Sequence, residues 1–218
     1  MSSPITLYLD LISPYAYLAW KAARPLAQRH QRALRPVPIL FAALLDHHGQ
    51  KGPAEIGPKR IYTFKHVTRL AAQAGLPLAP PPSHPFNPLT ALRVASLALP
   101  DAERDALLDA LFDATWGGGD GVETPEKVIA AAGRAGLDGA HLLAEASTPE
   151  SKGRLRSQTD EALTAGVFGV PTWEVDGELF WGYDAIPHVE LFLQGRDPVD
   201  PAALLRWKDL PASAERRR

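Results

Sequence analysis

The chain has 218 residues, of which 45% are hydrophobic and 22% charged, a composition typical of a globular protein with one large or two small domains. Its 23 basic and 25 acidic residues give a formal net charge of −2. This balance lacks the broad positive field that nucleic acid or anionic lipid requires, so we expect neither as a partner. The chain contains no cysteine, which excludes disulfides, cysteine-based metal centres and a protein thiol nucleophile.

The first residues lack the basic and apolar regions of a secretory signal. No stretch approaches the roughly 18 consecutive apolar residues of a spanning helix. We therefore expect a cytoplasmic protein that is not bound to a membrane.

The first 41 residues have the pattern of a strand, a helix and a second strand. Residues 5–12 are apolar and β-prone, and they run into Ser13 and Pro14, which suit a helix N-cap and the first helical position. Helical spacing then continues for about four turns. Residues 34–40 form an extended segment whose prolines favour either an edge position or a strand that begins late. This order predicts a right-handed βαβ unit.

Between residues 41 and 166 the β-branched runs disappear, and segments rich in alanine and leucine replace them. The proline-dense residues 77–88 predict an ordered loop or an extended arm. Helix-start residues and apolar spacing predict several helices in this region. They occupy residues 58–74 and 89–99, and further helices start with a cap at Asp101, Thr124 and Thr148.

After Gly166 the β-prone residues return. Residues 172–175 and 179–181 flank Asp176 and Gly177, a two-residue turn of the kind that closes a β-hairpin. Helical patterns follow at 184–193 and 201–205.

Strands at both ends of the chain, with helices between them, predict one sheet that is completed across an insertion. We therefore predict an α/β fold with one domain built from residues 1–41 and 166–210. Residues 42–165 form an inserted all-helical domain that covers the first domain, and residues 211–218 form a frayed tail.

Ser13 is a candidate anion site. Backbone amides at a helix N-terminus carry partial positive charge, and a cap hydroxyl adds one directed donor, so a bound thiolate would be stabilised there. Each unit by which a thiol pKa falls corresponds to about 1.4 kcal/mol of selective interaction with the thiolate. The alternative is that Ser13 only caps its own helix.

Pro171 directly precedes the strand predicted at 172–175. A proline at this place is unfavourable unless a special backbone geometry is held, and a cis Val170–Pro171 bond is one such geometry. It would leave the backbone groups of Val170 free for a ligand. The alternative is a trans proline at the start of a strand.

Five motifs in this order resemble those of the 2-hydroxychromene-2-carboxylate isomerases. That family is related to the kappa-class glutathione transferases and, more distantly, to the DsbA-type oxidoreductases. The resemblance covers about residues 5–193 and implies a thioredoxin-like fold with an inserted helical domain. The motifs are Ser13-Pro14-Tyr15-Ala16-Tyr17, Pro58-Lys59-Arg60-x-Tyr62, Phe86-Asn87-Pro88-Leu89-x-Ala91-x-Arg93, Val167-Phe168-Gly169-Val170-Pro171-Thr172 and Phe180-Trp181-Gly182-x-Asp184.

The resemblance implies that glutathione is the cofactor. Ser13, which falls where the oxidoreductases keep their first cysteine, would be the catalytic residue and donate to the glutathione sulfur. Val170, before the cis proline Pro171, would pair its backbone with the cysteinyl part of the tripeptide.

The charged ends of glutathione have implied partners as well. Asp184 would bind the α-amino group, the backbone around Tyr183 and Ala185 would hold the neighbouring carboxylate, and Lys59 would pair with a carboxylate. Without the resemblance, Lys59 reads as a solvated surface charge and Asp184 as a helix cap.

A pocket for an aromatic substrate is also expected, although aromatic residues more often belong to a core. Asn87 or Arg93 is a candidate to hold the substrate carboxylate. The aromatic candidates are Tyr15, Tyr62, Phe86 and Trp181.

Two residues depart from the family pattern. Gln50 stands in a loop where relatives often carry an asparagine that reaches glutathione, and Tyr183 is bulkier than the usual residue at its position. His47 and His48 have no accompanying ligand pattern, so we expect them in a surface loop and expect no metal site.

The predicted function is therefore a glutathione-dependent isomerase that acts on a 2-hydroxychromene-2-carboxylate-like compound in aromatic catabolism, as a homodimer. The alternatives are a kappa-like glutathione transferase or peroxidase, and a non-catalytic thioredoxin-like binding module. The missing cysteines exclude a disulfide oxidoreductase.

Overall fold

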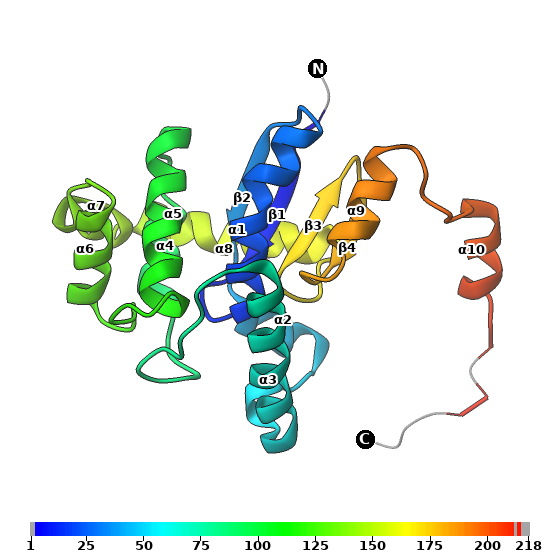
Figure 1. Cartoon of the computed structure of the whole chain (residues 1–218), viewed down its shortest axis with the longest axis horizontal. Helices are drawn as coiled ribbons and strands as arrows, with labels where there is room; N and C mark the ends of the chain where they lie inside the picture. Colours follow the sequence, from blue (N-terminus) through cyan, green and yellow to red (C-terminus); the bar gives the residue numbers. More distant parts are fainter. Residues whose placement is uncertain (1–2, 212, 215–218) are drawn as a thin grey trace.

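The computed structural model describes residues 3–211, 213 and 214. At its centre is a four-stranded sheet with the strand order β2-β1-β3-β4 (Figure 1). β1 (Ile5–Leu9) and β2 (Leu34–Pro38) are parallel, whereas β3 (Thr172–Val175) is antiparallel to both β1 and β4 (Glu178–Trp181). The predicted strand–helix–strand unit, the edge position of the proline-containing strand and the C-terminal hairpin are confirmed.

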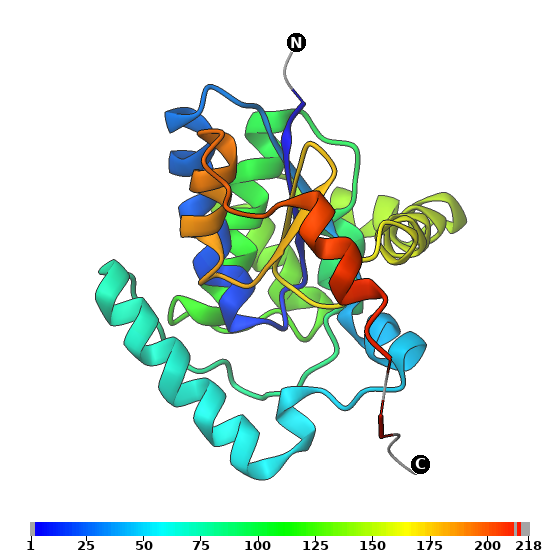
Figure 2. The same cartoon turned by 90° about the vertical axis from the view of Figure 1, so that its right-hand side faces the viewer.

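Helices cover both faces of the sheet. α1 (Pro14–Arg29) and α9 (Ile186–Leu193) lie on one face, and α2 (Phe41–His48) and α8 (Pro149–Thr164) lie on the other (Figure 2). This arrangement buries the apolar strands on both sides, as the near-continuous hydrophobic character of β1 requires. The expected α/β class is confirmed.

The chain between β2 and β3 consists of helices and loops, as predicted. Its core is continuous with that of the sheet and α1, and we call this shared cluster, which includes Leu7, Trp20, Leu92, Phe112 and Val128, the main core. The division into two domains stays a prediction. Besides α2 and α8 the segment contains η1 (Pro53–Glu55), α3 (Gly57–Ala74), α4 (Leu89–Ala95), α5 (Asp101–Trp116), α6 (Pro125–Arg134) and α7 (Gly139–Ala146).

Several predicted helix ends need correction. α4 ends at Ala95 instead of residue 99, and Ser96 occupies its C-cap with Oγ donating to Leu92 O at 2.7 Å. Pro100 disfavours helical backbone at Leu99, so the helix does not resume before α5. Asp101 is the first residue of α5, and Pro100 occupies the cap position. The caps Thr124 and Thr148 are confirmed, since their hydroxyls accept from Lys127 N and Ser151 N.

The C-terminal helix α10 (Pro201–Lys208), predicted from its pattern, stands away from the rest of the protein with every residue exposed (Figure 1). Of the predicted frayed tail, residues 212 and 215–218 lie outside the described residues. Within the part of the chain that is described, no helix combines the length and hydrophobicity that a membrane span requires.

Three buried tryptophans donate hydrogen bonds from the core, two of them to loops that follow strands and one to helix α5. Trp116 Nε1 donates to Leu11 O at 2.9 Å, and Trp173 Nε1 donates to Gly182 O at 3.1 Å. Trp20 Nε1 donates to Asp109 Oδ1 at 2.9 Å. Because each indole N–H keeps a hydrogen-bond partner, these rings can be buried without an unpaired polar group.

Asp10 explains why β1 ends at Leu9, three residues earlier than predicted. Its fully buried carboxylate accepts from Ile12 N at 3.0 Å and from Phe41 N at 2.9 Å. Its carbonyl accepts from Ser13 N at 3.1 Å, which closes a turn. Burial raises the pKa of Asp10 to about 7, although the two amide hydrogen bonds oppose this shift.

The Asp10→Asn variant should lose the pH dependence that this carboxyl contributes to stability. Because the pKa rises from 3.8 to about 7 on folding, the folded chain holds a proton that the unfolded chain releases between these values. Relative to the variant, the wild-type free energy of unfolding should fall as pH rises from about 4 to 7, by up to about 1.4 kcal/mol per pH unit. Urea denaturation across this range measures the difference, and parallel curves would contradict it.

Candidate active site

Ser13 occupies the N-cap of α1, where the loop that leaves β1 meets the helix. Its Oγ accepts from Ala16 N at 3.2 Å, and the residue is 9% exposed. A hydroxyl has one donor and two acceptor lone pairs, so capping leaves its hydrogen available. Among the described residues this hydrogen has no protein acceptor. Ser13 therefore caps its helix and can still donate to an anion at the same point.

The Val170–Pro171 peptide bond is cis, as the resemblance implied. Pro171 O accepts from Gly182 N at 2.9 Å, and Thr172 Oγ1 donates to Gly169 O at 2.8 Å. Both bonds use neighbours of Val170. The backbone N–H and C=O of Val170 itself have no partner within the described residues, so they are free to pair with an extended ligand.

The sheet register brings this loop beside Ser13. β1 and β3 pair with Tyr8 opposite Thr172, so the next positions of the ladder place Pro171 alongside the end of β1. The same end of β1 leads directly into the turn before Ser13.

An exposed aromatic pair flanks the proline loop. The rings of Phe168 and Trp181 meet edge to face with centroids 5.2 Å apart, and the two residues are 43% and 59% exposed. A Cβ on Gly169 would lie 2.5 Å from Trp181 Nε1, so the indole can cross the loop only above a glycine. This pair offers an apolar surface next to the proline loop.

A second cluster joins α1 to α3. Tyr15 Oη lies 2.9 Å from His66 Nδ1, and the Tyr62 ring stacks on His66 at 5.8 Å between centroids. Burial raises the pKa of Tyr15, and the nearby Tyr62 and the carboxylate of Asp184 raise it further. The predicted residues Tyr15 and Tyr62 are therefore brought together around His66, and Asp184 lies close enough to influence Tyr15 electrostatically.

Lys59 is exposed near the start of α3. It lies three residues before Tyr62 and seven before His66, so the three side chains share one face of the helix. That face carries a cation at one end and the aromatic cluster at the other.

The loop between β4 and α9 holds the remaining glutathione candidates. Asp184 is exposed, and its carboxylate oxygen Oδ1 lies against the backbone of Gly182, in space that a Cβ would occupy. Residue 182 also has a φ of +107°, a conformation that favours glycine. Tyr183 packs against the main core, and Ala185 is the N-cap of α9. The N–H groups of Tyr183 and Ala185 have no protein acceptor in the described residues, so both can donate to a ligand carboxylate.

The structure does not join every predicted residue to this cluster. Asn87 Oδ1 accepts from Leu89 N at 3.0 Å, so its side chain starts α4, and Phe86 is buried in the main core. Gln50 is exposed after α2. Arg93 lines a depression between α2, α4 and α8, where Leu40, Ala43, Leu89, Lys152, Leu155, Arg156, Thr159 and Asp160 surround it.

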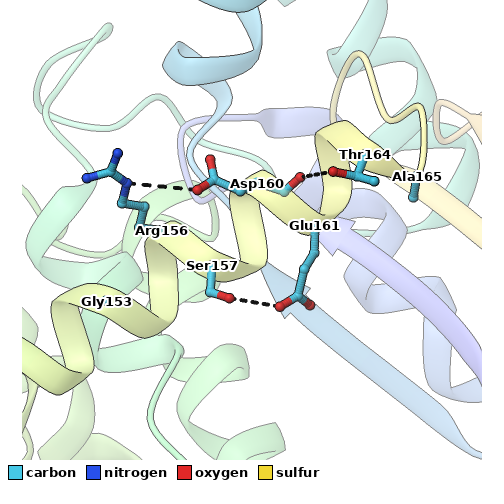
Figure 3. A pocket seen from close by; sticks show the side chains of 7 residues that line it. All are labelled: Gly153, Arg156, Ser157, Asp160, Glu161, Thr164 and Ala165. Carbon is cyan, nitrogen blue, oxygen red and sulfur yellow. Dashed lines mark hydrogen bonds and ion pairs between the residues drawn. The ribbon is translucent and has the colours of Figure 1, made fainter.

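A further depression lies on the outer face of α8 and is lined by residues of that helix and Ala165 (Figure 3). Its polar groups pair along the helix: Ser157 donates to Glu161 at 2.8 Å, and Arg156 lies 3.8 Å from Asp160. None of the site residues predicted from the sequence lines it. It is a solvated helix face.

Sequence reasoning missed two residues of the site, His66 and Phe168. Phe168 belongs to a quoted motif, and its place before Gly169 could have drawn attention to it. The signal for His66 is its spacing from Lys59 and Tyr62 on one helical face. His47 and His48, expected in a surface loop, instead form the exposed end of α2.

Comparison with known proteins agrees with this geometry. A 2-hydroxychromene-2-carboxylate isomerase of Sphingobium xenophagum is 29% identical over 195 residues, covering 88% of this chain and 99% of the relative. The glutathione S-transferase kappa 1 of Rattus norvegicus is 25% identical over 189 residues, covering 81% and 83%. The solved structure of a 2-hydroxychromene-2-carboxylate isomerase superimposes with a TM-score of 0.78 at 24% identity, covering 94% and 97%.

The resemblance drawn from the five motifs is thus confirmed, and so is the thioredoxin-like fold. The DSBA-like thioredoxin domain family matches residues 4–194. Since this match spans every strand of the sheet, the chain belongs to the DSBA-like thioredoxin family.

Proposed function

We propose that the protein is a glutathione-dependent isomerase of a 2-hydroxychromene-2-carboxylate-like aromatic compound in aromatic catabolism. The observation that carries this proposal is the Ser13 hydroxyl at the start of α1, beside a cis-proline loop, in a chain without cysteine. The relatives named as isomerases of this compound support it.

The described residues fit glutathione, a tripeptide with one ammonium and two carboxylate groups. Ser13 would donate to its sulfur, and the free backbone groups of Val170 would pair with its cysteinyl unit. Asp184 would bind the ammonium group, while the N–H groups of Tyr183 and Ala185 would bind the neighbouring carboxylate. Lys59, exposed on α3, would pair with the second carboxylate.

Bound glutathione would supply a thiolate nucleophile that adds to the substrate, allows a carbon–carbon bond to rotate, and leaves again. The protein holds the negative charge at the N-terminus of α1. The exposed rings of Phe168 and Trp181 would form an apolar border for an aromatic substrate, and the exposed Tyr62 on α3 is a further candidate. The expected homodimer and cytoplasmic location stay predictions from the sequence.

The Ser13→Ala variant should lose the thiolate of bound glutathione near neutral pH. The hydroxyl donates to the anion and not to the neutral thiol, so its removal raises the thiol pKa. Ultraviolet titration of the thiolate band in wild type and variant measures this change.

Thr148→Ala is the matched control for this titration. It removes an equivalent N-cap, since Thr148 Oγ1 accepts from Ser151 N at 3.2 Å on α8, and should cost a similar roughly 1 kcal/mol of stability. It should leave the thiolate band unchanged. Equal titration of the Ser13→Ala variant and wild type would remove Ser13 from the mechanism.

The Asp184→Asn variant should weaken glutathione binding up to about 5-fold, because an exposed ion pair to the ammonium group is lost. Isothermal titration calorimetry measures the dissociation constant. An analogue of glutathione that lacks the α-amino group should bind wild type and variant equally. If the variant weakened the analogue just as much, Asp184 would not be the ammonium partner.

The kappa-class relatives favour a glutathione transferase as the second candidate. An isomerase returns the thiol after every turnover, so the free thiol concentration should stay constant while substrate is converted. A transferase given a chlorodinitrobenzene-type acceptor would consume one thiol for each product molecule. Thiol assays on both reactions separate the two functions, and a non-catalytic binding module would give neither.

A further inference from the structure

The contact between Tyr15 and His66 joins α1 to α3 near the start of α1, and the carboxylate of Asp184 is close enough to act on Tyr15 electrostatically. Tyr15 lies two residues after Ser13 in the first turn of α1, His66 comes from α3, and Asp184 comes from the loop after β4. The pair therefore lies next to the proposed thiolate site and is not part of it.

The imidazole of His66 is held from two sides. Its Nδ1 lies 2.9 Å from Tyr15 Oη, and the exposed ring of Tyr62 stacks on it with an interplanar angle of 23°. A hydrogen bond in the ring plane and a stack across the ring face fix both the position and the tilt of an imidazole. Such a constraint suits a group that must present one ring nitrogen to one partner.

The pKa of the Tyr15 hydroxyl is raised, chiefly by burial and further by Tyr62 and the Asp184 carboxylate, although a hydrogen bond with Thr63 opposes this shift. Tyr15 therefore stays a proton donor at neutral pH. A neutral His66 accepts the phenolic hydrogen at Nδ1. A protonated His66 instead donates from Nδ1 to the phenolic oxygen, which leaves the Tyr15 hydrogen free to point to a substrate.

We propose that Tyr15 gives a proton to, and later takes it back from, the substrate oxygen that becomes negatively charged during the isomerisation. In this proposal His66 is the positioning residue that aligns the Tyr15 hydroxyl and replaces its proton. The inference rests on the proposed isomerase function and adds the acid–base chemistry that a thiolate alone does not supply.

The protons balance over the cycle. When the thiolate adds to the conjugated carbon–carbon double bond of the ring-opened substrate, a carbon–sulfur bond forms and the electron pair of the double bond passes to the carbonyl oxygen. The O–H bond of Tyr15 then breaks and a new O–H bond forms on the substrate. The proton on His66 Nδ1 moves to the Tyr15 oxygen. When the carbonyl re-forms, both protons return in reverse order, so no net proton or electron is consumed.

The charged and titratable groups around the pair come from two elements besides α1. α3 contributes Tyr62, Lys59 and Arg69, which share the His66 face by helical spacing, and the loop after β4 contributes Asp184. Because cations and an anion both lie around the pair, the pH dependence of kcat cannot be assigned from the neighbouring charges. It must be measured in variants of Tyr15 and His66.

The first test needs neither glutathione nor turnover. ¹⁵N NMR of the imidazole nitrogens in the free protein should show that Tyr15→Phe moves the signals of one of the seven histidines, His66, which His66→Phe identifies. The exposed His141 serves as control, since His141→Phe should remove one signal and leave that of His66 in place. If Tyr15→Phe moved no imidazole signal, the pair would not exist in solution and the inference would fall.

The second test uses steady-state kinetics with glutathione and the substrate. Tyr15→Phe should lower kcat about 100-fold or more, within the range of general acid–base catalysis, without weakening glutathione binding to the same extent. His66→Phe keeps a ring beneath Tyr62 and should lower kcat about 10-fold. His66→Asn keeps a hydrogen-bond acceptor near the Nδ1 position and should recover part of kcat.

The pH profile separates positioning from proton supply. The pH profile of kcat should differ between wild type and both His66 variants, because only the wild-type imidazole can return a proton to the Tyr15 oxygen. His66 variants that kept the wild-type kcat and profile would overturn the inference while the isomerase function stood. A wild-type protein that turned over no substrate would overturn the proposed function, and this inference with it.

Discussion

The site depends on the buried carboxylate of Asp10 at the junction of β1 and α1. It accepts the N–H of Ile12, in the loop toward Ser13, and the N–H of Phe41, at the start of α2. The Asp10 side chain thus links the loop between β1 and α1 to the segment that follows β2. Because both paths leave the same end of parallel strands, the N-cap hydroxyl of Ser13 is held at a defined point above the edge of the sheet.

The helical segment between β2 and β3 also contacts the junction of β1 and α1, in addition to covering the core. Trp116 at the end of α5 donates to Leu11 O, and His84 Nε2 lies 3.2 Å from Ile12 O. The His84 ring contacts Trp116 with centroids 5.5 Å apart. Two consecutive carbonyls just before Ser13 therefore have partners from the insertion. A loop with satisfied polar groups can stay rigid while it presents a hydroxyl to a ligand.

Local chemistry explains how much of this could be predicted from the sequence. The cap at Ser13, the turn at Asp176 and Gly177, and the threonine caps at Thr124 and Thr148 each depend on residues within a few positions, so pattern and propensity sufficed. The contact of His66 with Tyr15 depends on how α3 packs against α1, which no local pattern encodes. The same limit applies to the motif that contains Phe86, Asn87 and Arg93, from which a role at the site was predicted. In the structure Asn87 starts helix α4, Phe86 lies in the main core, and Arg93 lines another depression.

A serine at the cap, in a chain with no cysteine, changes what the helix N-terminus can do. A cysteine there would itself become a thiolate, because the N-terminal amides lower its pKa. A serine hydroxyl does not ionise near neutral pH. The partial positive charges of the N-terminal amides therefore act on an anion that a ligand supplies. An external thiolate leaves once its addition is reversed, and proton movement at the substrate then needs a separate group. Tyr15, two residues further along the same turn and hydrogen-bonded to His66, is placed to be that group.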